Sequence, residues 1–296
     1  MLRSLLVAVD LSAISDRVIA RVAQLPLAAD ARITLLHVVS NGLPAHARRS
    51  AARDANKVLR DQVASLAEAL PSTVEIGHRV EVGAPAAEVI ACARSVRAKL
   101  VVMGRGGGRA IRDIFLGSTA ERVVRQTKLP VLVVRLRPRS RYRRPVLAVD
   151  LDRVAHDVLG ALLRMVPSPR PAVTVIHAYN VPYEGLVYPS LTMDDAAESR
   201  EYYRDKARRE LSKLLASSLD EHGVAAKDIP AFAIHAEAGS ARSVVEKTVK
   251  KVDADLVVLG THGYAGLAYA FLGTVAGDVL RHVACDVLVV PPRESA

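Results

Sequence analysis

The sequence repeats itself at the scale of a whole domain, and this repeat constrains the fold more than any other feature. Five segments of the first half recur in the same order in the second half: 5–12 with 146–152, 33–39 with 173–179, 81–90 with 237–246, 99–107 with 255–263, and 115–134 with 271–290. The offset is 140 residues for the first two pairs and 156 for the others, so the second copy holds 16 extra residues between His177 and Gly239. Because one repeat has the length of a domain, the pattern indicates a tandem duplication and not a solenoid of short units.

An arginine-rich stretch, Leu136–Arg144, separates the two copies, with Pro138 and Pro145 as punctuation. We therefore predict a first domain at 1–138, a linker at 139–144 and a second domain at 145–296. The arginines at 135–144 are expected to form a solvated linker, and binding of a polyanion is the alternative.

Within the first copy, short runs of Val, Leu and Ile alternate with amphipathic stretches. The expected strands are 4–9, 32–39, 74–80, 99–103 and 130–134, and the expected helices are about 13–26, 46–70, 85–96 and 117–127. Ser12 is a candidate N-cap for the first helix, and Asp152 takes that place in the second copy. Near-continuous apolar strands that alternate with helices are typical of a parallel sheet covered on both faces.

We therefore predict an α/β fold of two tandem Rossmann-like or flavodoxin-like domains, packed as a pseudo-dimer. Each domain should contain a parallel five-stranded sheet with helices on both faces. Ligands of such sheets bind at the carboxyl ends of the strands, at a topological switch point.

The net charge of +10 is concentrated in the first copy. Residues 1–140 hold 22 Lys/Arg against 11 Asp/Glu, whereas residues 145–296 hold 16 against 20. Since no nucleic-acid-binding motif accompanies this charge, a solvated basic surface is expected and a nucleic-acid partner is not.

The remaining composition points to an ordinary cytoplasmic protein. Only two cysteines are present and they form no C-x-x-C, which argues against a disulfide scaffold or a zinc site. No apolar run is long enough to span a bilayer, so no membrane insertion is expected. The first ten residues, MLRSLLVAVD, lack a cleavage site for a signal peptide.

Each copy contains a complete glycine-rich loop with the pattern G-x2-G-x9-G-[ST], which starts at the end of an apolar strand and finishes at the start of a helix. The loops are Gly104, Gly107, Gly117 and Ser118 in the first copy, and Gly260, Gly263, Gly273 and Thr274 in the second. Glycine lets backbone N–H groups approach an anion closely, and a helix N-terminus adds unpaired donors. The spacing differs from the Walker loop, which needs a Lys, and from the Rossmann G-x-G-x-x-G, which follows the first strand. Two matches in register indicate a pair of phosphate-binding loops.

These loops, together with the VAVD first strand and the LLHV second strand, resemble the universal stress protein family. The resemblance covers nearly all of both halves. It implies a fold like that of ATP pyrophosphatases and electron-transfer flavoproteins, and binding of ATP, since loop-bearing members of the family bind ATP.

The resemblance also implies a set of ATP-binding residues in each copy. In the first copy these are Ala8, Val9, Asp10, Val38, Met103, Gly104, Arg105, Gly107, Gly117, Ser118 and Thr119. In the second copy they are Ala148, Val149, Asp150, Ala178, Leu259, Gly260, Thr261, His262, Gly263, Gly273, Thr274 and Val275. Asp10 and Asp150 would face the ribose or a Mg²⁺ held through the phosphates, and the alternative is that each caps the following helix. Gly106 stands where many members carry His or Arg.

The two loops differ in charge, because Arg105, Arg109 and Arg112 lie in or beside the first loop and the second has no Lys or Arg between its glycines. Arginine strengthens phosphate binding. We therefore expect the first copy to bind ATP more tightly than the second.

Several other residues have a structural and a functional interpretation. His37 and His177, which end the second strand of each copy, are expected to be structural because no nucleophile or acid partner is evident. His262 could contact phosphate or only form a turn, and Cys92 is expected in the core with redox sensing as the alternative. The extra segment of the second copy carries four tyrosines, Tyr183, Tyr188, Tyr202 and Tyr203, which could cover its own site or contact a partner.

The expected function is ATP-dependent sensing or regulation in the stress response, acting through an unknown protein partner and with a homodimer or the pseudo-dimer of domains as the assembly. One alternative is a slow ATPase or an autophosphorylating protein using Ser118 or Thr274, although no catalytic residue is identified and neither loop has a Lys. The other is an interaction protein whose nucleotide sites are vestigial.

Overall fold

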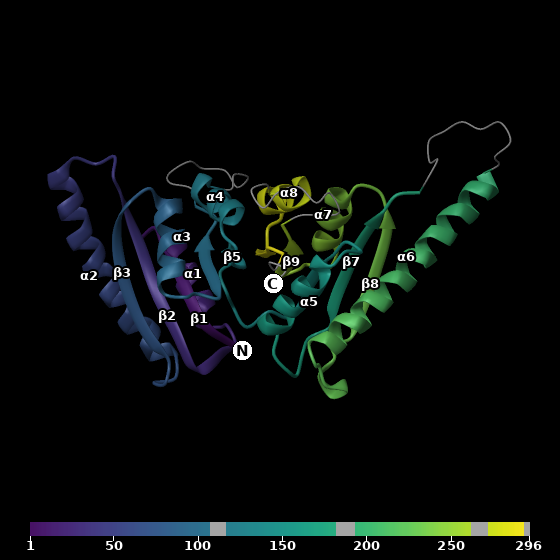
Figure 1. Ribbon diagram of the computed structural model, residues 1–296, viewed down its shortest axis with the longest axis horizontal. Coiled ribbons are helices and arrows are strands. Elements are labelled where there is room, and N and C mark those ends of the chain that lie inside the picture. The colour runs from purple at the N-terminus through teal and green to yellow at the C-terminus, as the bar shows by residue number, and fades with distance from the viewer. Residues whose placement is uncertain (107–116, 182–192, 262–271, 293–296) are drawn as a thin grey trace.

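The computed structural model describes residues 1–106, 117–181, 193–261 and 272–292 (Figure 1). The first half runs β1 (Leu2–Ala8), α1 (Ala13–Val22), β2 (Leu27–Ser40), α2 (Ala45–Ala69), β3 (Glu75–Gly83), α3 (Pro85–Ser95), β4 (Leu100–Gly104), α4 (Ser118–Gln126) and β5 (Val131–Val134). The second half runs β6 (Pro145–Ala148), α5 (Val154–Met165), β7 (Val173–Tyr179), α6 (Met193–Glu221), the short 3₁₀ turn η1 (Ala226–Asp228), β8 (Phe232–Ala238), α7 (Ala241–Lys251), β9 (Leu256–Gly260), α8 (Thr274–His282) and β10 (Asp286–Val290). The alternation of strands and helices predicted from the sequence is confirmed in both copies.

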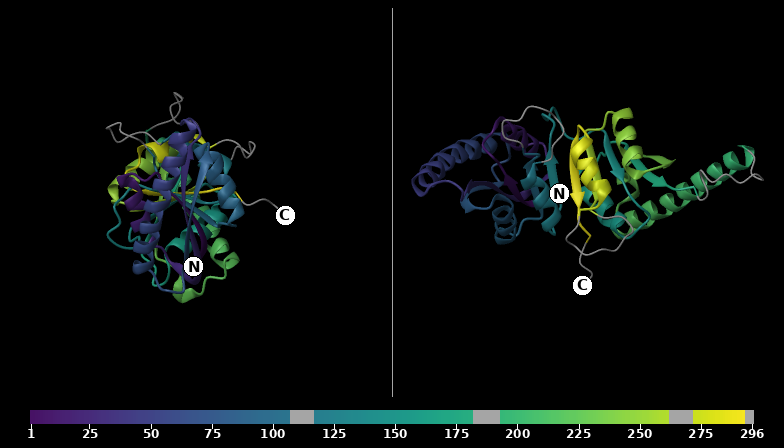
Figure 2. Two further views of the ribbon diagram at one scale, coloured as in Figure 1. Left: turned by 90° about the vertical axis from the view of Figure 1, so that its left-hand side faces the viewer. Right: turned by 90° about the horizontal axis from the view of Figure 1, so that it is seen from above.

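All ten strands form one sheet in the order β3-β2-β1-β4-β5-β10-β9-β6-β7-β8. Each half contributes five parallel strands in the same order, as predicted, and the halves meet where β5 pairs with β10 antiparallel. The central pair of this junction is Leu132 with Leu288, which are equivalent residues of the two copies. The duplicated halves are therefore related by a pseudo-twofold axis through this pair, and α2 and α6 lie at opposite ends of the molecule (Figures 1 and 2).

Helices cover both faces of the sheet. Neighbouring residues of each buried strand point to opposite faces, so each face carries apolar side chains that a layer of helices buries. On one face, Leu5 and Val7 of β1 pack in the same core as Val18 of α1 and Leu59 of α2. On the other face, Leu6 packs with residues of α3 and α4. Each of these two cores continues across the junction into the second half, so the two domains share their hydrophobic layers.

The arginine-rich segment 135–144 between the domains was expected to be solvated, and this expectation is wrong for part of it. The carboxylate of Asp286, which is fully buried, accepts hydrogen bonds from the backbone N–H groups of Arg135 (2.7 Å) and Leu136 (2.9 Å) and from the hydroxyl of Tyr142 (2.8 Å). It also pairs with the buried guanidinium of Arg21 at 3.0 Å. A carboxylate from the last strand thereby attaches the connecting segment and α1 to the second half.

A second carboxylate holds the far end of the connecting segment. Asp255 accepts hydrogen bonds from the backbone N–H groups of Arg143 (2.7 Å) and Arg144 (3.0 Å). The side chains of Arg143 and Arg144 remain exposed, so the solvated interpretation holds for them and fails for Arg135 and Tyr142.

The two predicted N-caps behave differently. Ser12 caps α1 by accepting a hydrogen bond from the Ile14 N–H, as predicted. In the second copy the capping position is Arg153, and Asp152 lies one residue earlier, where its carboxylate accepts from the Ala155 N–H at 3.3 Å. Of the helices that the structure describes, none is long and apolar enough to cross a membrane.

Candidate nucleotide site

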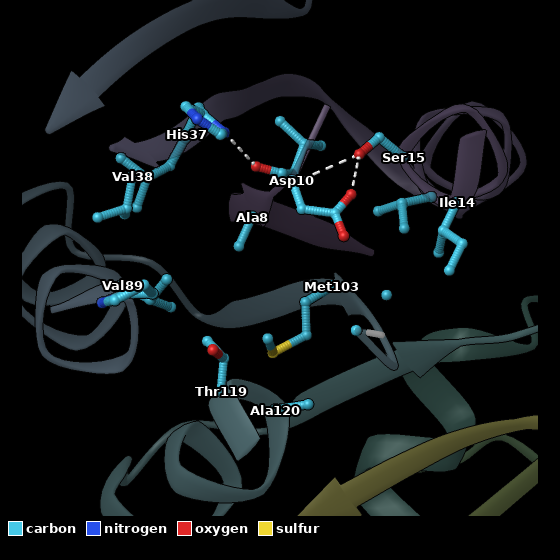
Figure 3. Close-up of a pocket in the computed structure, with 16 residues that line it drawn as sticks. Ala8, Asp10, Ile14, Ser15, His37, Val38, Val89, Met103, Thr119 and Ala120 are labelled. Atoms are coloured by element: carbon cyan, nitrogen blue, oxygen red, sulfur yellow. Dashed lines mark hydrogen bonds between the residues drawn. The ribbon is translucent and has the colours of Figure 1, made fainter. Parts of the chain in front are cut away.

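A cavity of about 210 Å³ opens at the carboxyl ends of β1, β2 and β4 in the first half (Figure 3). The strand order reverses between β1 and β4, so the cavity lies at the switch point where open α/β sheets bind ligands. Seven predicted site residues line it, namely Ala8, Val9, Asp10, Val38, Met103, Gly104 and Thr119. Arg105, Gly117 and Ser118 lie beside it and not in its wall, and Gly107 lies outside the described residues.

The wall of the cavity is mostly apolar and closed by helices that the motif analysis did not include. Ile14 and Val18, one turn apart on α1, form one side, and Pro85 and Val89 of α3 form another. The i, i+4 spacing of Ile14 and Val18 was the available signal, but it predicts a buried helix face without saying that a cavity lies beside it. Gly104 has to be a glycine here, since a Cβ on it would lie 2.7 Å from Ile14 Cγ2.

Asp10 lies two residues past the end of β1 and is exposed, so it does not belong to the buried strand itself. Its Oδ1 accepts hydrogen bonds from the Ser12 hydroxyl (2.6 Å), the Ser15 hydroxyl (2.9 Å) and the Ser12 N–H (3.1 Å). Burial by itself raises the pKa of the Asp10 carboxyl, but these hydrogen bonds outweigh it, and the pKa is lowered below its usual value. The carboxylate is thus held ionised at the start of α1, facing the cavity (Figure 3).

Asp10 does not itself cap α1, because Ser12 is the N-cap and the backbone N–H that the Asp10 carboxylate accepts from, that of Ser12, precedes the helix. One carboxylate oxygen organises the first turn of α1 through Ser12 and Ser15, and Asp10 still lines the cavity. Ser15, which is buried, also accepts a hydrogen bond from the Asp10 N–H at 3.1 Å. Ser15 is a site residue that the sequence analysis missed.

The two ends of the first loop are joined at its base. The Gly117 N–H donates to the Arg105 carbonyl at 2.7 Å, and a Cβ on Gly117 would lie 2.8 Å from that same oxygen. Gly106 has a φ of +70°, a conformation that suits glycine. Gly117 is thus required for closing the loop, and its N–H, which was expected to face phosphate, is already used.

The N-terminus of α4 points its remaining donors to the loop side. Gly117 is the N-cap and supplies no side-chain cap, and the Glu121 N–H bonds back to the Gly117 carbonyl at 3.1 Å. The N–H groups of Ser118 and Thr119 belong to the first turn, which has no intrahelical acceptors. A helix N-terminus of this kind favours an anion.

A second cation lies close to the loop. Burial, and then the charge of Arg105, lower the pKa of Arg135 to about 10. The guanidinium of Arg135 donates to the carbonyls of Leu280 and Val283, at the C-terminal end of α8. An anion near Arg105 would reduce the repulsion between these two guanidinium groups.

The two histidines make the backbone contacts expected of structural residues, and His37 also lines the cavity. Nδ1 of His37 lies 2.9 Å from the Val9 carbonyl, and Nδ1 of His177 lies 3.1 Å from the Val149 carbonyl. Since a carbonyl oxygen only accepts, Nδ1 must carry the proton in both rings. Each histidine therefore ties the end of the second strand to the residue before the aspartate.

The second copy brings equivalent residues to the same end of its sheet, but with fewer hydroxyl groups. Ala148 ends β6 and Ala178 lies in β7, Leu259 and Gly260 end β9, and Gly273 is the N-cap of α8, with Thr274 and Val275 in its first turn. The base of the loop is closed in the same way, by the Gly273 N–H and the Thr261 carbonyl at 2.8 Å. His262 and Gly263 lie outside the described residues, as do Arg109, Arg112, Tyr183 and Tyr188.

The aspartates of the second copy have different surroundings. Asp150 is exposed and accepts from the Leu151 N–H at 2.8 Å, and Ala155 replaces the buried serine of the first copy. Burial raises the pKa of Asp152, and the charge of Asp150 adds to this in the same direction. An additional carboxylate thus stands where the first copy has Ser12.

Comparison with known proteins agrees with the duplicated fold. Residues 1–135 and 141–291 both match the model of the universal stress protein family. The chain belongs to the universal stress protein family. A universal stress protein of Mycolicibacterium smegmatis is 28% identical over 313 residues, which cover 98% of this chain and 97% of that protein.

Other members of the family match one half or the whole chain. The universal stress protein Sll1388 of Synechocystis sp. is 30% identical over 158 residues, which are 50% of this chain and 97% of that protein. The crystal structure of a universal stress protein from Archaeoglobus fulgidus superposes with a TM-score of 0.69 and 17% identity, covering 97% of this chain and 98% of that one. The tandem universal stress protein architecture predicted from the repeat is thereby confirmed.

Proposed function

We propose that each half of this universal stress protein binds ATP and that the nucleotide sets the conformation or the protein partners of a stress-response regulator. The observation that carries the proposal is the cavity at the switch point of the first half, which seven of the residues implied by the family resemblance line. Its apolar wall suits a flat base, and its polar edge lies between Asp10 and the N-terminus of α4.

Each part of the nucleotide would meet a chemically suitable group. The base would lie among Ala8, Val38, Val89 and Met103. The ribose would face the ionised Asp10, and the phosphates would extend to the first turn of α4, where helix N–H groups and Arg105 favour negative charge.

A metal ion would have to come with the phosphates. Among the described residues, no group of three or more His, Cys, Asp or Glu side chains could hold a metal ion. Mg²⁺ bound to a nucleotide needs only one or two carboxylates in addition to phosphate oxygens and water, and Asp10 is placed to supply one.

Helix α1 offers a route from the nucleotide to the second half. Ile14, Ser15 and Val18 line the cavity, while Arg21, one turn further on, forms the buried pair with Asp286 of β10. A ligand that orders α1 would therefore act directly on the junction. In the second copy Ala161 stands where Arg21 does, so this route runs from the first site only.

The first site is proposed to be the stronger one. Arg105 adds a positive charge to its loop, and Thr119 supplies a hydroxyl group where the second copy has Val275. Ser15 holds Asp10 in place, and the second copy has Ala155 at that position. The second site has the additional carboxylate of Asp152, which disfavours phosphate unless a cation is bound.

The protein is proposed to act in the cytoplasm and not as a fast enzyme. Cys92 and Cys285 are both buried as free thiols, which suits a reducing compartment. Glu121, the acidic residue in the first turn of α4, accepts a hydrogen bond from the cationic Arg125 at 2.7 Å, which makes its carboxylate a weaker base for Ser118.

The test is to identify nucleotide released from freshly purified protein and then to titrate ATP into the emptied protein by calorimetry. Two binding events of unequal affinity are expected, and Gly117→Val should abolish the stronger one because its side chain would collide with the Arg105 carbonyl. Gly273→Val should abolish the weaker one.

Gly77→Ala is the matched control, since a Cβ at Gly77 meets nothing within 4 Å. Retained binding in the Gly117→Val/Gly273→Val double variant would contradict the site assignment. Bound ADP with steady turnover would favour a slow ATPase, and absence of both bound nucleotide and measurable affinity would favour an interaction protein with vestigial sites.

A further inference from the structure

Helix α2 forms one end of the molecule and leaves one long side uncovered (Figure 1). Its apolar side is complete, since Ala55, Leu59 and Leu66 are buried against the sheet. The opposite, polar face of this 25-residue helix is exposed to solvent, and no other element of the described chain packs over it.

Four cations form a row along this face, which we call the basic stripe: Arg49, Arg53, Lys57 and Arg60. All four are exposed, and their spacing of four, four and three residues places them within an arc of about 80° and over about 17 Å of helix. None of the ion pairs among the described residues involves them. Arg48 points elsewhere and donates to the Asn41 carbonyl at 3.3 Å.

The stripe opposes the stability of its own helix. Like charges three or four residues apart repel each other, and positive charge near the start of a helix opposes the macrodipole. No acidic residue lies in the first turn of α2, and its N-cap, Pro44, makes no side-chain cap. Asp54 and Asp61 lie about 60° and 40° beyond Lys57, at one edge of the stripe, and no ion pair among the described residues joins them to it.

The equivalent helix of the second half is different. On α6, Arg204 pairs with Glu201 at 2.9 Å and with Asp205 at 3.5 Å, and acidic residues alternate with basic ones along its length. The row of four cations is therefore a property of the first copy, since on α6 only three exposed cations, Lys206, Arg209 and Lys213, share one face.

We propose that the basic stripe binds the phosphate backbone of nucleic acid, without reading its sequence. A row of unpaired cations on a straight helix matches a linear polyanion, and such binding needs no recognition motif because it is driven by counterion release. A membrane surface fits less well, since helices that bind membranes insert an apolar face, and the apolar face of α2 is buried. A nucleic-acid partner was not expected from the sequence, which contains no recognition motif and does not show that these four cations are exposed.

The test measures binding of a fluorescein-labelled 25-base-pair DNA duplex to the full chain by fluorescence anisotropy at several salt concentrations. With four phosphate contacts, the logarithm of the association constant should fall with the logarithm of the salt concentration with a slope of about −3.6. This corresponds to a loss of roughly 150-fold in affinity between about 50 and 200 mM salt.

The variant Arg49→Gln/Arg53→Gln/Lys57→Gln should reduce the slope to about −1, because one contact remains. The control is Lys99→Gln/Lys227→Gln/Lys250→Gln, which removes three exposed charges that lie on separate segments and share no helix face, and it should leave the slope nearly unchanged. Both variants should bind ATP like the parent, because none of these residues lines the nucleotide cavity, and an unchanged ATP titration also shows that the variants are folded.

Three results would overturn the proposal. They are an equal loss of slope in both variants, which would mean that only the overall charge matters; the absence of DNA binding at about 50 mM salt; and binding to vesicles with about 30% anionic lipid in place of DNA. Since ATP binding is measured separately, failure of this proposal is distinguishable from failure of the proposed nucleotide site.

Discussion

The buried pair between Arg21 and Asp286 should be one of the most sensitive positions in this protein. The two side chains are 3% and 0% exposed, and their contact at 3.0 Å joins the first half to the last strand. In Asp286→Asn the amide keeps an oxygen for the backbone N–H groups of Arg135 and Leu136, but the charge opposite Arg21 is lost. The Arg21 guanidinium then stays buried without a counter-charge, and its remaining contacts are the Ser140 carbonyl at 2.9 Å and the ring of Tyr142 at 4.2 Å.

We expect Asp286→Asn to lower the free energy of unfolding by about 3–5 kcal/mol, the usual cost of leaving a buried charge unpaired. This is a large part of the roughly 5–15 kcal/mol that stabilises a typical domain. Urea unfolding followed by circular dichroism at neutral pH measures it. The exposed pair of Arg3 and Asp30, 2.8 Å apart, provides the control, because Asp30→Asn should cost no more than about 1 kcal/mol.

A second variant separates the charge effect from lost packing. If the uncompensated charge is the cause, adding Arg21→Met to Asp286→Asn should destabilise the protein by clearly less than the sum of the two single variants. A loss for Asp286→Asn that is no greater than that for Asp30→Asn would refute the reasoning, and so would strict additivity of the two buried substitutions.

Three further predictions concern the thiol at the junction and the first nucleotide site. Burial raises the pKa of Cys285 from 9.0 to about 12. The protonated thiol therefore contributes stability below pH 9, and this contribution is lost as the pH rises toward 12, so the urea midpoint of the parent should fall over this range. Cys285→Ala should make this fall smaller between about pH 8 and pH 10.5. Ser15→Ala removes a hydroxyl that donates to Asp10 and should cost about 1 kcal/mol in urea unfolding, and an unchanged acid-unfolding midpoint would contradict its part in lowering the Asp10 pKa. Arg105→Gln should weaken ATP binding at the first site roughly tenfold in calorimetry while the second site is unaffected, whereas an equal effect at both sites would contradict the assignment of this residue to one loop.

The periodic elements of this chain could be read from the sequence because they are local. The predicted helix at 85–96 is Pro85–Ser95 in the structure, and the predicted helix at 46–70 is Ala45–Ala69. Hydrophobic periodicity, and the Gly and Pro residues that interrupt helices and strands, act over a few residues. These signals can therefore be recognised in the sequence without knowledge of tertiary contacts. Because the second half repeats the sequence of the first, the same alternation of strands and helices could be predicted there.

The candidate site was predictable in part for the same reason. Glycines after a strand mark the end of β4, and Gly104 and Thr119, which the family resemblance implied as site residues, both line the cavity. The sequence could not show that Gly117 closes the loop through its own N–H, or that Ser15 holds Asp10, because both contacts depend on the path of the folded backbone.

By itself, the sequence determined two similar α/β units, their parallel strands and the position of a glycine-rich loop in each. Only the tertiary structure decided that the units share one ten-stranded sheet, through the antiparallel pairing of β5 with β10. The physical reason is distance along the chain: Asp286 meets Arg21 across 265 residues and the Arg135 N–H across 151. No local pattern encodes such partners, and a buried carboxylate reveals its role only when the charges and donors around it are in place.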